Sequence, residues 1–305
     1  MWFKNLLIYR FNTSVDIDQT TFHQQLQEQA FKPCGKQDTH RYGWVSPMGA
    51  DISEELFHST NGCLMICAKR EEKVLPAAVI KEKLEEKVAH IELTEDRRVY
   101  GKEKQSLKED IIFECLPQAF TKSQRTYAYI DTVKGWLIID ASSHAKAEDL
   151  MKMLRQSLGS LPVIPLQVSE SPAVIMTAWL RGEDIPNDVE LGSECELREA
   201  GEEGSILRCK HQDLYAPEIE QHLNTGKQVV KLALEWNETL KCLIGDDLSI
   251  KRVKFADKLV DEANDASGGD KAMQFDADVA VMTLNLRELA DALLSWFGGV
   301  APEAQ

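Results

Sequence analysis

The chain has 305 residues, of which 43% are hydrophobic and 28% are charged, so it has the apolar content of a protein that buries a core. The 35 Lys+Arg against 50 Asp+Glu give a formal net charge of -15, which argues against a polybasic coat that binds nucleic acid or membrane through net charge alone. No apolar run approaches the roughly 18 residues of a membrane-spanning helix. The N-terminus lacks the pattern of a secretory signal peptide, so we expect a cytoplasmic protein.

The N-terminal stretch predicts strands separated by a helix and loops. Residues 3–10 and 62–69 are typical of strands, and residues 18–30 are typical of a short helix with one apolar face. Gly and Pro residues between them predict loops, with a short strand at 43–45.

A long amphipathic helix is predicted from Pro76, because proline suits the first turn of a helix and an apolar stripe follows. The stripe consists of Ile80, Leu84, Val88 and Ile91. Polarity rises after Leu93, so we expect this helix to project beyond the core. Gly101 is expected to break it, and a second helix is predicted to end by Pro117.

The next segment predicts a hairpin followed by a helix. Residues 124–131 and 135–140 are typical of two strands joined by a tight turn. Ser143 suits the start of the helix that follows, and Gly159 suits its end.

The apolar connector 160–166, stiffened by two prolines, is where we predict the main domain boundary. An N-terminal α+β region, 1–168, would carry projecting helices at about 76–120; it contains 22 Lys+Arg and 23 Asp+Glu. The C-terminal α+β region, 169–305, contains 13 Lys+Arg and 27 Asp+Glu, a balance of -14. The acidity is therefore almost entirely C-terminal.

The C-terminal half predicts a meander of strands with short helices. Most strands look hairpin-connected, which favours an α+β fold over a doubly wound parallel sheet. The predicted elements are a helix at 173–180, strands at 193–198 and 204–210, a helix from Pro217, strands at 227–236, 239–244 and 248–255, a mobile loop at 262–273, a strand at 275–284 and a helix at 286–297.

Seven widely spaced cysteines and no Cys-x-x-Cys indicate free thiols in a reducing compartment. Cys63 and Cys67 fall on one face of a predicted strand. We interpret them as buried thiols, with a pair of metal ligands as the alternative.

The sequence contains no Gly-rich phosphate-binding motif, no G-x-S-x-G and no H-E-x-x-H. Two acidic pairs, Asp246-Asp247 and Asp276-x-Asp278, are compatible with Mg²⁺ in principle. The first falls between two predicted strands, where an acidic turn is the commoner explanation, and the second would share one face of an edge strand. We therefore predict no catalytic residue, no metal site and no cofactor.

Basic pairs recur on the predicted C-terminal strands, and in each pair both side chains would point to one face. The pairs are Arg208 with Lys210, Lys227 with Lys231, and Arg252 with Lys254, the last beside Ile250. Such side chains can follow the phosphates of a nucleic acid without reading its bases. An ordinary solvated sheet face is the alternative interpretation.

Several short motifs occur together and in order along the chain, and they resemble the bacterial recombination-associated RdgC family nearly end to end. The motifs are Trp2-Phe3-Lys4-Asn5-Leu6, Arg70-Glu71-Glu72-Lys73-Val74-Leu75-Pro76, Leu158-Gly159-Ser160-Leu161-Pro162-Val163, Lys210-His211-Gln212-Asp213-Leu214 and Lys231-Leu232-Ala233-Leu234. The resemblance implies a cytoplasmic, nucleoid-associated protein that binds duplex DNA with little sequence preference, with single-stranded DNA as a second candidate ligand.

The resemblance also implies an elongated, curved monomer with mixed or antiparallel sheets and flanking helices. Two copies would close into a ring-shaped homodimer around DNA, with acids outside and bases lining the hole, and the ring would restrain RecA-driven strand exchange. The residues expected to contact phosphate are Lys73, Arg97, Arg98, Lys102, Lys104, Arg125 and Lys227.

Members of the family are thought to close the ring partly through an aromatic residue after Leu-Pro-x-Ala and a Lys-Gln pair before Asp-Leu. The matching positions here are Phe120 and the pair His211-Gln212, so a histidine stands where the family has lysine. A histidine carries less charge than a lysine near neutral pH, so this contact is expected to depend on pH. From the residues alone, Phe120 would instead be a core residue after a helix.

Two other functions stay open. The chain would inhibit a recombinase by direct protein contact, with incidental DNA binding, or it would be a metal-dependent nuclease using Asp246, Asp247, Asp276 and Asp278. Absence of Mg²⁺-dependent cleavage would exclude the nuclease. Loss of inhibition together with DNA binding would favour the DNA-binding ring.

Overall fold

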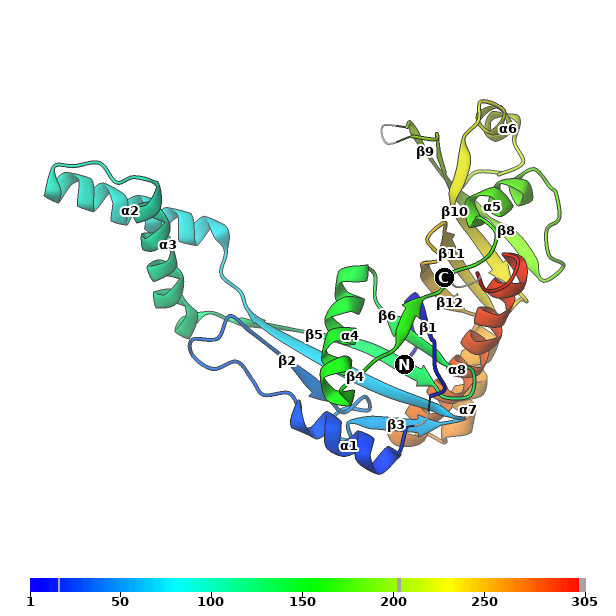
Figure 1. Ribbon diagram of the computed structural model, residues 1–305, viewed down its shortest axis with the longest axis horizontal. Helices are drawn as coiled ribbons and strands as arrows, with labels where there is room; N and C mark the ends of the chain where they lie inside the picture. The colour runs from blue at the N-terminus through cyan, green and yellow to red at the C-terminus, as the bar shows by residue number, and fades with distance from the viewer. Residues whose placement is uncertain (16, 202–203, 302–305) are drawn as a thin grey trace.

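One twelve-stranded sheet connects the two ends of the molecule (Figure 1). The computed structural model describes residues 1–15, 17–201 and 204–301. Its strands are β1 (Asn5–Phe11), β2 (His40–Val45), β3 (Phe57–Thr60), β4 (Cys63–Lys73), β5 (Thr121–Asp131), β6 (Trp136–Asp140), β7 (Val163–Pro165), β8 (Val189–Arg198), β9 (Ile206–Lys210), β10 (Gln228–Trp236), β11 (Leu240–Gly245) and β12 (Ile250–Phe255). They lie in the order β2-β4-β5-β6-β1-β12-β11-β10-β8-β9, with β3 beside β4 and β7 beside β1.

Neighbouring strands are antiparallel in every pairing of the described residues. The helices that accompany them are α1 (Gln19–Glu28), α2 (Ala77–Glu95), α3 (Gly101–Cys115), the short 3₁₀ turn η1 (Leu116–Gln118), α4 (His144–Leu158), α5 (Pro172–Leu180), α6 (Pro217–Asn224), α7 (Asp257–Ser267) and α8 (Lys271–Trp296). The predicted α+β class with an antiparallel sheet is confirmed.

Helices cover the N-terminal half of the sheet on both faces. On one face, α1 and α4 pack against strand residues such as Leu64 and Ile66 in one buried cluster. On the other face, Cys63 and Met65 join a second cluster that contains α5, α8 and the C-terminal strands. Alternate residues of β4 therefore enter two different cores, as the pleat of a strand with two covered faces requires.

The C-terminal half of the sheet is covered on one face only. Leu232, Ile244 and Ile250 point into the cluster that holds α5 and α8. The cluster under α1 and α4 includes no residue of β8–β12 among the described residues. Alternate residues of these five strands therefore face solvent on the side of the sheet where α4 lies.

The molecule is curved, as the family resemblance led us to expect. Figure 1 shows one arm formed by α2 and α3 beyond the ends of β4 and β5, and a second arm formed by β8–β12 with α5 and α6. α4 lies between the arms on the concave side. The helical arm and the C-terminal arm therefore present different surfaces to the hollow between them.

The helical arm has a small core of its own. Ile80 and Leu84 of α2 pack against Ile111 of α3, and these three are the fully buried members of the cluster. α2 ends at Asp96, which adopts a left-handed conformation with φ 48°, so the break precedes the predicted one at Gly101, the first residue of α3. The prediction that these helices project beyond the main core is confirmed.

Two predictions for the C-terminal segment are wrong. Residues 275–284 are not a strand but the middle of α8, whose buried residues recur at helical spacing: Phe275, Val279, Met282, Leu286, Leu289 and Leu293. The predicted mobile loop at 262–273 is mostly helical: residues 262–267 end α7, which is capped by Gly268 in a left-handed conformation, and residues 271–273 begin α8. The helix predicted from 286 begins at Lys271, where Asp270 caps it.

The sheet continues across the predicted domain boundary at 160–166. β7 pairs with β1, and β1 also pairs with β12 through Asn5↔Lys251 and Leu6↔Ile250. Whether 1–168 and 169–305 behave as separate folding units stays a prediction. Within the described residues, every helix is too short or too polar to be a candidate for crossing a membrane.

Candidate nucleic-acid interface

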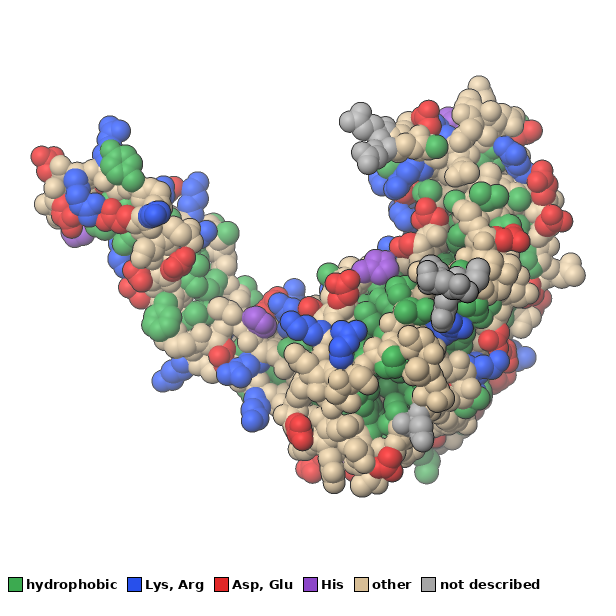
Figure 2. All heavy atoms as spheres, viewed as in Figure 1, with side chains coloured by type: hydrophobic (Ala, Val, Ile, Leu, Met, Phe, Trp, Pro, Cys, Tyr) green, Lys and Arg blue, Asp and Glu red, His purple; other side chains and the backbone are tan. Residues whose placement is uncertain are grey.

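Lys and Arg side chains gather on the uncovered face of β8–β12, on the side that borders the hollow of the molecule (Figure 2). We call this surface the open face. Strand register places four glutamates on it: Glu190, Glu194, Glu196 and Glu235. Register and the contacts of Arg252 place eight basic residues on it: Arg198, Arg208, Lys210, Lys231, Lys241, Lys251, Arg252 and Lys254.

The open face reverses the charge of the region that contains it. Residues 169–305 have 13 Lys+Arg and 27 Asp+Glu. Strand register places eight of those 13 bases on the open face, against four glutamates among the described strand residues, while Asp246 and Asp247 of the β11–β12 turn lie near Arg198 and Lys251. A polyanion near this surface therefore meets positive potential although the region as a whole is acidic, because a phosphate backbone responds to the local field.

The alternation of β10 sets up this surface. Val229, Leu232 and Leu234 are buried on one side, and Lys231 and Glu235 lie on the other. β12 reaches the same result through a β-bulge: Arg252 has φ 54° and the register with β11 shifts there. The prediction that Arg252 and Lys254 share the side of Ile250 is therefore wrong, because the bulge turns Ile250 into the core.

Glu196 joins three basic residues on the open face. Its carboxylate accepts hydrogen bonds from Arg208 Nε and Lys231 Nζ, each at 2.9 Å, while Arg198 lies 3.7 Å away. Burial opposes ionisation of Glu196, but the hydrogen bonds from Arg208 and Lys231 outweigh it and lower the pKa. The glutamate therefore stays ionised and fixes the direction of the surrounding cations.

A second contact bridges strands that are not neighbours. Arg252 of β12 donates two hydrogen bonds, of 2.7 and 2.8 Å, to Glu194 of β8, and these lower the pKa of Glu194. β11 and β10 lie between the two strands. Small side chains permit the crossing: a Cβ added to Gly192 would lie 2.9 Å from the Cβ of Ala233. The bridge therefore ties β12 to β8 across the open face.

Lys210 and Lys251 take part in none of the ion pairs formed by the described residues. Lys210 is exposed at the end of β9, and Lys251 is half-buried on β12. These two side chains are available to an external anion without breaking an internal contact.

Four of the predicted phosphate contacts lie at the tip of the helical arm. Arg97 donates hydrogen bonds to Glu95 and, through two nitrogens, to Glu103. Arg98, Lys102 and Lys104 are exposed between α2 and α3 or on the first turn of α3. Ion pairs with Glu95 and Glu103 therefore already engage the Arg97 guanidinium.

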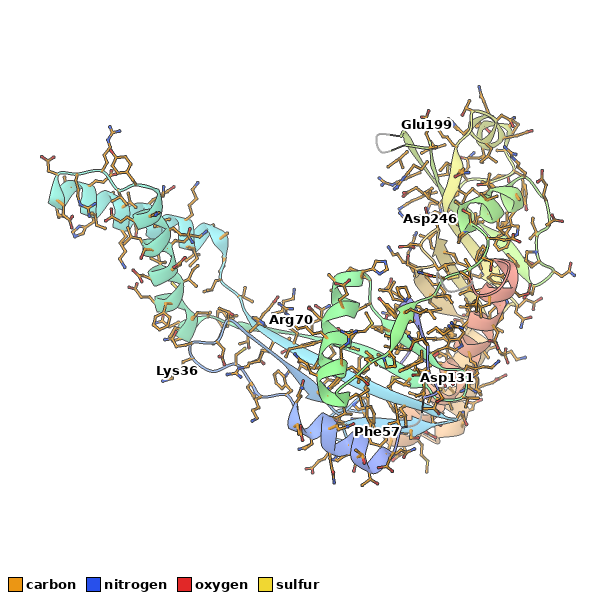
Figure 3. All side chains as sticks on the ribbon, in the orientation of Figure 1. Lys36, Phe57, Arg70, Asp131, Glu199 and Asp246 are labelled. Carbon is orange, nitrogen blue, oxygen red and sulfur yellow. The ribbon has the colours of Figure 1, made fainter. Side chains whose placement is uncertain are left out.

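The other three predicted contacts lie elsewhere. Lys73 and Arg125 project from β4 and β5 on the face opposite α4, since Ala68 and Ala128 alternate toward α4. Lys227 is mostly buried and binds Ser205 and Glu199, the latter near the outer end of the C-terminal arm (Figure 3). The structure therefore distributes the seven predicted residues over three places rather than one surface.

Sequence reasoning left Lys241 and Lys251 out of the basic pairs. A signal for them was present, because Lys241 lies between the apolar Leu240 and Cys242, and Lys251 follows Ile250. Strand alternation alone would have found Lys241. Lys251 faces outward because it alternates with the buried Ile250, and the bulge at Arg252 then brings Lys254 to the same side.

The residues expected to close the ring lie on opposite arms. Phe120 follows η1 at the foot of the helical arm and its side chain is 86% exposed, so the interpretation as a core residue is wrong. His211, with φ 53°, and Gln212 follow β9 and line a shallow hollow of about 630 Å³ with Leu191, Tyr215 and Lys241. An exposed aromatic ring at the foot of the helical arm and a shallow hollow on the C-terminal arm thus lie on the two arms of the molecule.

The acidic pairs do not assemble into one site. Asp246 and Asp247 belong to the β11–β12 turn, where Asp247 accepts hydrogen bonds from Ser249. Asp276 and Asp278 lie on α8, where they pair with His58 and with the amino group of Met1. No group of three or more His, Cys, Asp or Glu suited to a metal occurs in the described part of the chain.

The turn carboxylates differ in their ionisation. Burial and the neighbouring Asp247 raise the pKa of Asp246. Burial also acts against ionisation of Asp247, but hydrogen bonds from Ser249 outweigh it and lower the pKa. This pattern matches an acidic turn held by local hydrogen bonds, the commoner of the two interpretations.

Cys63 and Cys67 are buried, as interpreted from the sequence. Burial raises the pKa of Cys63 to about 11 and that of Cys67 to about 12. Their cross-strand neighbours on β5 are Asp131 and Tyr127 rather than further thiols. Both cysteines therefore serve as small apolar residues of the core.

The fold and the open face define a curved α+β protein in which the uncovered surface of β8–β12 is rich in Lys and Arg. Comparison with known proteins gives the family: residues 1–300 match the model described as "Putative exonuclease, RdgC". Proteins named "Recombination-associated protein RdgC" are similar along their whole length. That of Aeromonas hydrophila is 45% identical over 98% of each chain, that of Psychromonas ingrahamii is 46% identical over 98% of this chain and 99% of its own, and that of Yersinia pestis is 42% identical over 99% of both. The chain belongs to the RdgC family of recombination-associated proteins.

Proposed function

We propose that this protein is a non-catalytic, nucleoid-associated protein that binds duplex DNA without sequence preference and restrains RecA-mediated recombination as a ring-shaped homodimer. The observation that carries the proposal is the open face, which gathers eight of the 13 basic residues of an otherwise acidic region. Family membership adds the link to recombination.

The chemistry of the open face favours contact with phosphate over contact with bases. Its basic side chains stand on strands at regular intervals, and several are already oriented by glutamates. Such contacts position a protein on DNA but carry no sequence information. Of the seven residues predicted from the sequence, we expect Arg98, Lys102 and Lys104, which are exposed on the helical arm, to add weaker phosphate contacts of the same kind.

The proposed ring uses both ends of the curved monomer. Phe120 exposes its ring at the foot of the helical arm, and His211 and Gln212 line the hollow on the C-terminal arm. A two-fold axis repeats each contact, so contacts at both ends of two copies close a ring rather than start a fibre. An exposed aromatic side chain gains burial in such a contact.

A closed ring restrains a recombinase by occupying the duplex that strand exchange requires. The test compares linear with covalently closed circular duplex in a gel shift, with the mass in solution measured in parallel. We expect a dimer at micromolar concentration and slower release from circles than from linear molecules. A monomer, or equal release from both substrates, would overturn the ring.

A variant of the open face distinguishes direct protein contact with RecA from inhibition through DNA binding. Lys210→Glu with Lys251→Glu removes the two basic side chains of the open face that form no internal ion pair. We expect these changes to weaken inhibition of strand exchange in proportion to the loss of affinity for DNA. Inhibition that survives the loss of DNA binding would favour the protein-contact function.

The nuclease alternative has its own test, because the family description includes the word exonuclease. The four aspartates proposed for it are divided between a turn and α8, and Asp247, Asp276 and Asp278 have other partners. We expect no Mg²⁺-dependent release of nucleotides from linear duplex. Cleavage by the protein that disappears in Asp246→Asn or Asp276→Asn would establish the nuclease instead.

A further inference from the structure

Cys195 and Cys209 face each other across the two outermost strands of the C-terminal arm. Cys195 lies on β8 and Cys209 on β9, and they are direct partners in the antiparallel register. Both are free thiols. Cys195 is 1% exposed, whereas Cys209 is partly exposed and packs against the same cluster.

This placement meets the geometric requirement for a disulfide. Residues directly opposite each other in an antiparallel pair have Cα atoms about 4.5–5.5 Å apart, within the roughly 4.4–6.8 Å that a disulfide spans. Cβ atoms at about 4.5–5.5 Å must approach by up to about 1 Å. β9 can supply that movement, because it is the edge strand and pairs only with β8 among the described strands.

We propose that Cys195 and Cys209 form a reversible disulfide that clamps the β8–β9 hairpin under oxidation by a peroxide. The Cys209 sulfur, as thiolate, attacks one peroxide oxygen; the O–O bond breaks, the leaving hydroxide is protonated to water, and Cys209 becomes a sulfenic acid. The Cys195 sulfur gives up its proton and attacks the Cys209 sulfur. The S–S bond forms, the S–O bond breaks and a second water leaves, so two thiols lose two electrons to one peroxide.

The order of these steps follows from exposure. Cys209 is the thiol that solvent reaches, so it meets the oxidant first. Burial, together with the neighbouring Cys209, raises the pKa of Cys195 to about 12, which leaves Cys195 the resolving thiol. A dithiol reductant reverses the reaction by thiol–disulfide exchange.

No other two cysteines of the described chain are paired in strand register. Cys63 and Cys67 share one strand and face Asp131 and Tyr127, and Cys242 faces Leu234. Cys242→Ser therefore provides a matched control, because it removes a buried thiol from the same half of the sheet without touching the pair.

The clamp acts on a segment that carries candidate contacts. Arg208 and Lys210 lie on β9, and His211 and Gln212 follow it directly. A bond between β8 and β9 fixes the strand that positions all four residues. Its consequence for DNA contact rests on the proposed function, whereas the bond itself does not.

The experiment exposes the full-length protein to hydrogen peroxide and maps peptides by mass spectrometry without reduction. We expect a single crosslinked peptide pair joining Cys195 to Cys209, with the loss of two hydrogen atoms and full reversal by dithiothreitol. The bridge should persist in Cys242→Ser and vanish in Cys209→Ser. Accumulation of sulfinic acid at Cys209 without a bridge, or a bridge between other cysteines, would overturn the proposal.

Hydrogen exchange supplies a second measurement that needs no variant. We expect the amides of β9 to exchange several-fold more slowly in the oxidised protein, with those of β1 and β6 unchanged. Equal exchange of β9 in both forms would show that the bond does not clamp the hairpin. Neither measurement uses DNA, so failure of the disulfide proposal leaves the DNA-binding proposal standing. Failure of the DNA-binding proposal likewise leaves the disulfide proposal standing.

Discussion

The two halves of the sheet differ in what covers them. The N-terminal strands carry helices on both faces, and their alternate residues fill two cores. The C-terminal strands use only one face for packing, so every second residue is free to be polar. The part of the sheet that contributes least to the core is therefore the part that can hold a charged surface.

Charge follows the same division. The N-terminal half is nearly neutral, with 22 Lys+Arg and 23 Asp+Glu, yet its bases are spread over the arm, the strand ends and α4. The C-terminal half is strongly acidic, yet most of its bases occupy one face. The comparison shows that when helices cover only one side of a sheet, basic residues can gather on the other side even in a segment whose net charge is acidic.

The largest effect is expected at the ion pair that joins the two halves. Arg287 of α8 donates a 2.6 Å hydrogen bond to Asp131, which is fully buried at the end of β5 (Figure 3). Arg287→Ala leaves that carboxylate without its cation, and loss of one partner of a buried pair costs about 3–5 kcal/mol. Urea unfolding at neutral pH measures the change in the free energy of unfolding.

The arm supplies the matched control. Arg97 makes equally short hydrogen bonds to Glu103, but its side chain is 44% exposed and solvent screens the pair, so Arg97→Ala should lower the free energy of unfolding far less than Arg287→Ala. Equal losses at the two sites would contradict the distinction between them. The shape of the urea curve also tests the predicted domain boundary: two transitions in Arg287→Ala would indicate separate units, and one transition a single unit.

Much of the fold was accessible from the sequence where local pattern and burial agree. The alternation of 227–236 predicts β10, and the stripe from Ile80 predicts α2, because each pattern matches the period of its element. α8 was divided wrongly because Val279, Val281 and Thr283 favour a strand locally, while packing of the long helix on the sheet decides the outcome.

The candidate site was less accessible. Basic pairs on the C-terminal strands were visible, but three features depend on contacts distant in sequence: the bulge at Arg252, the bridge from Arg252 to Glu194, and the absence of a helix over the open face in the described residues. Sequence spacing assigns a residue to a face. It does not say which face a helix will cover.

The second prediction separates the open face from the rest of the acidic half. Lys210→Glu with Lys251→Glu should lower the affinity for duplex DNA by about 10- to 100-fold at low salt, because two phosphate contacts are lost and repulsion is added. The slope of log K against log salt should become shallower by about 0.9 for each contact. Fluorescence anisotropy with a labelled duplex measures both.

Lys258→Glu with Lys271→Glu is the control, because it changes net charge by the same amount at exposed positions of α7 and α8 outside the open face. We expect its affinity to change by less than about two-fold and its slope to stay as in the original protein, since exposed charges beyond about 10 Å are screened. A loss equal to that of the open-face variant would mean that net charge, and not the open face, governs binding.

The third prediction concerns the carboxylate that orients the cations. The pKa of Glu196 in the folded protein lies below its ordinary value of 4.5, so ionised Glu196 stabilises the fold above that value and loses this effect as pH falls through the folded pKa. Glu196→Gln should therefore be less stable than the original protein by about 1–2 kcal/mol at neutral pH. The difference should shrink below about pH 4, as urea unfolding at both pH values would show.

Glu238→Gln is a suitable comparison, since Glu238 is an exposed turn residue between β10 and β11. It should change the free energy of unfolding by less than about 0.5 kcal/mol at either pH. A Glu196→Gln penalty that is the same at neutral and acid pH would show that the amide disturbs packing and that the charge of Glu196 is not the stabilising feature.

The smallest expected effect lies at the proposed ring contact, where His211 stands in place of the lysine of the family pattern. Charged groups of both signs surround it: Glu194 on β8, Lys210 beside it, Asp213 after it, and Glu235 and Lys241 in the same hollow. A positive charge at His211 gains from the acids and from a carboxylate or carbonyl of the second copy, so the contact should tighten as the histidine is protonated.

The dimer dissociation constant should fall several-fold between about pH 8 and about pH 6, which corresponds to about 1 kcal/mol. Sedimentation at several concentrations measures it; His211→Lys should remove most of the pH dependence, whereas His40→Lys, at the exposed start of β2, should leave it in place. If the pH response survives in His211→Lys, the histidine does not close the ring, and the two arms of the monomer meet their partner through Phe120 and other residues.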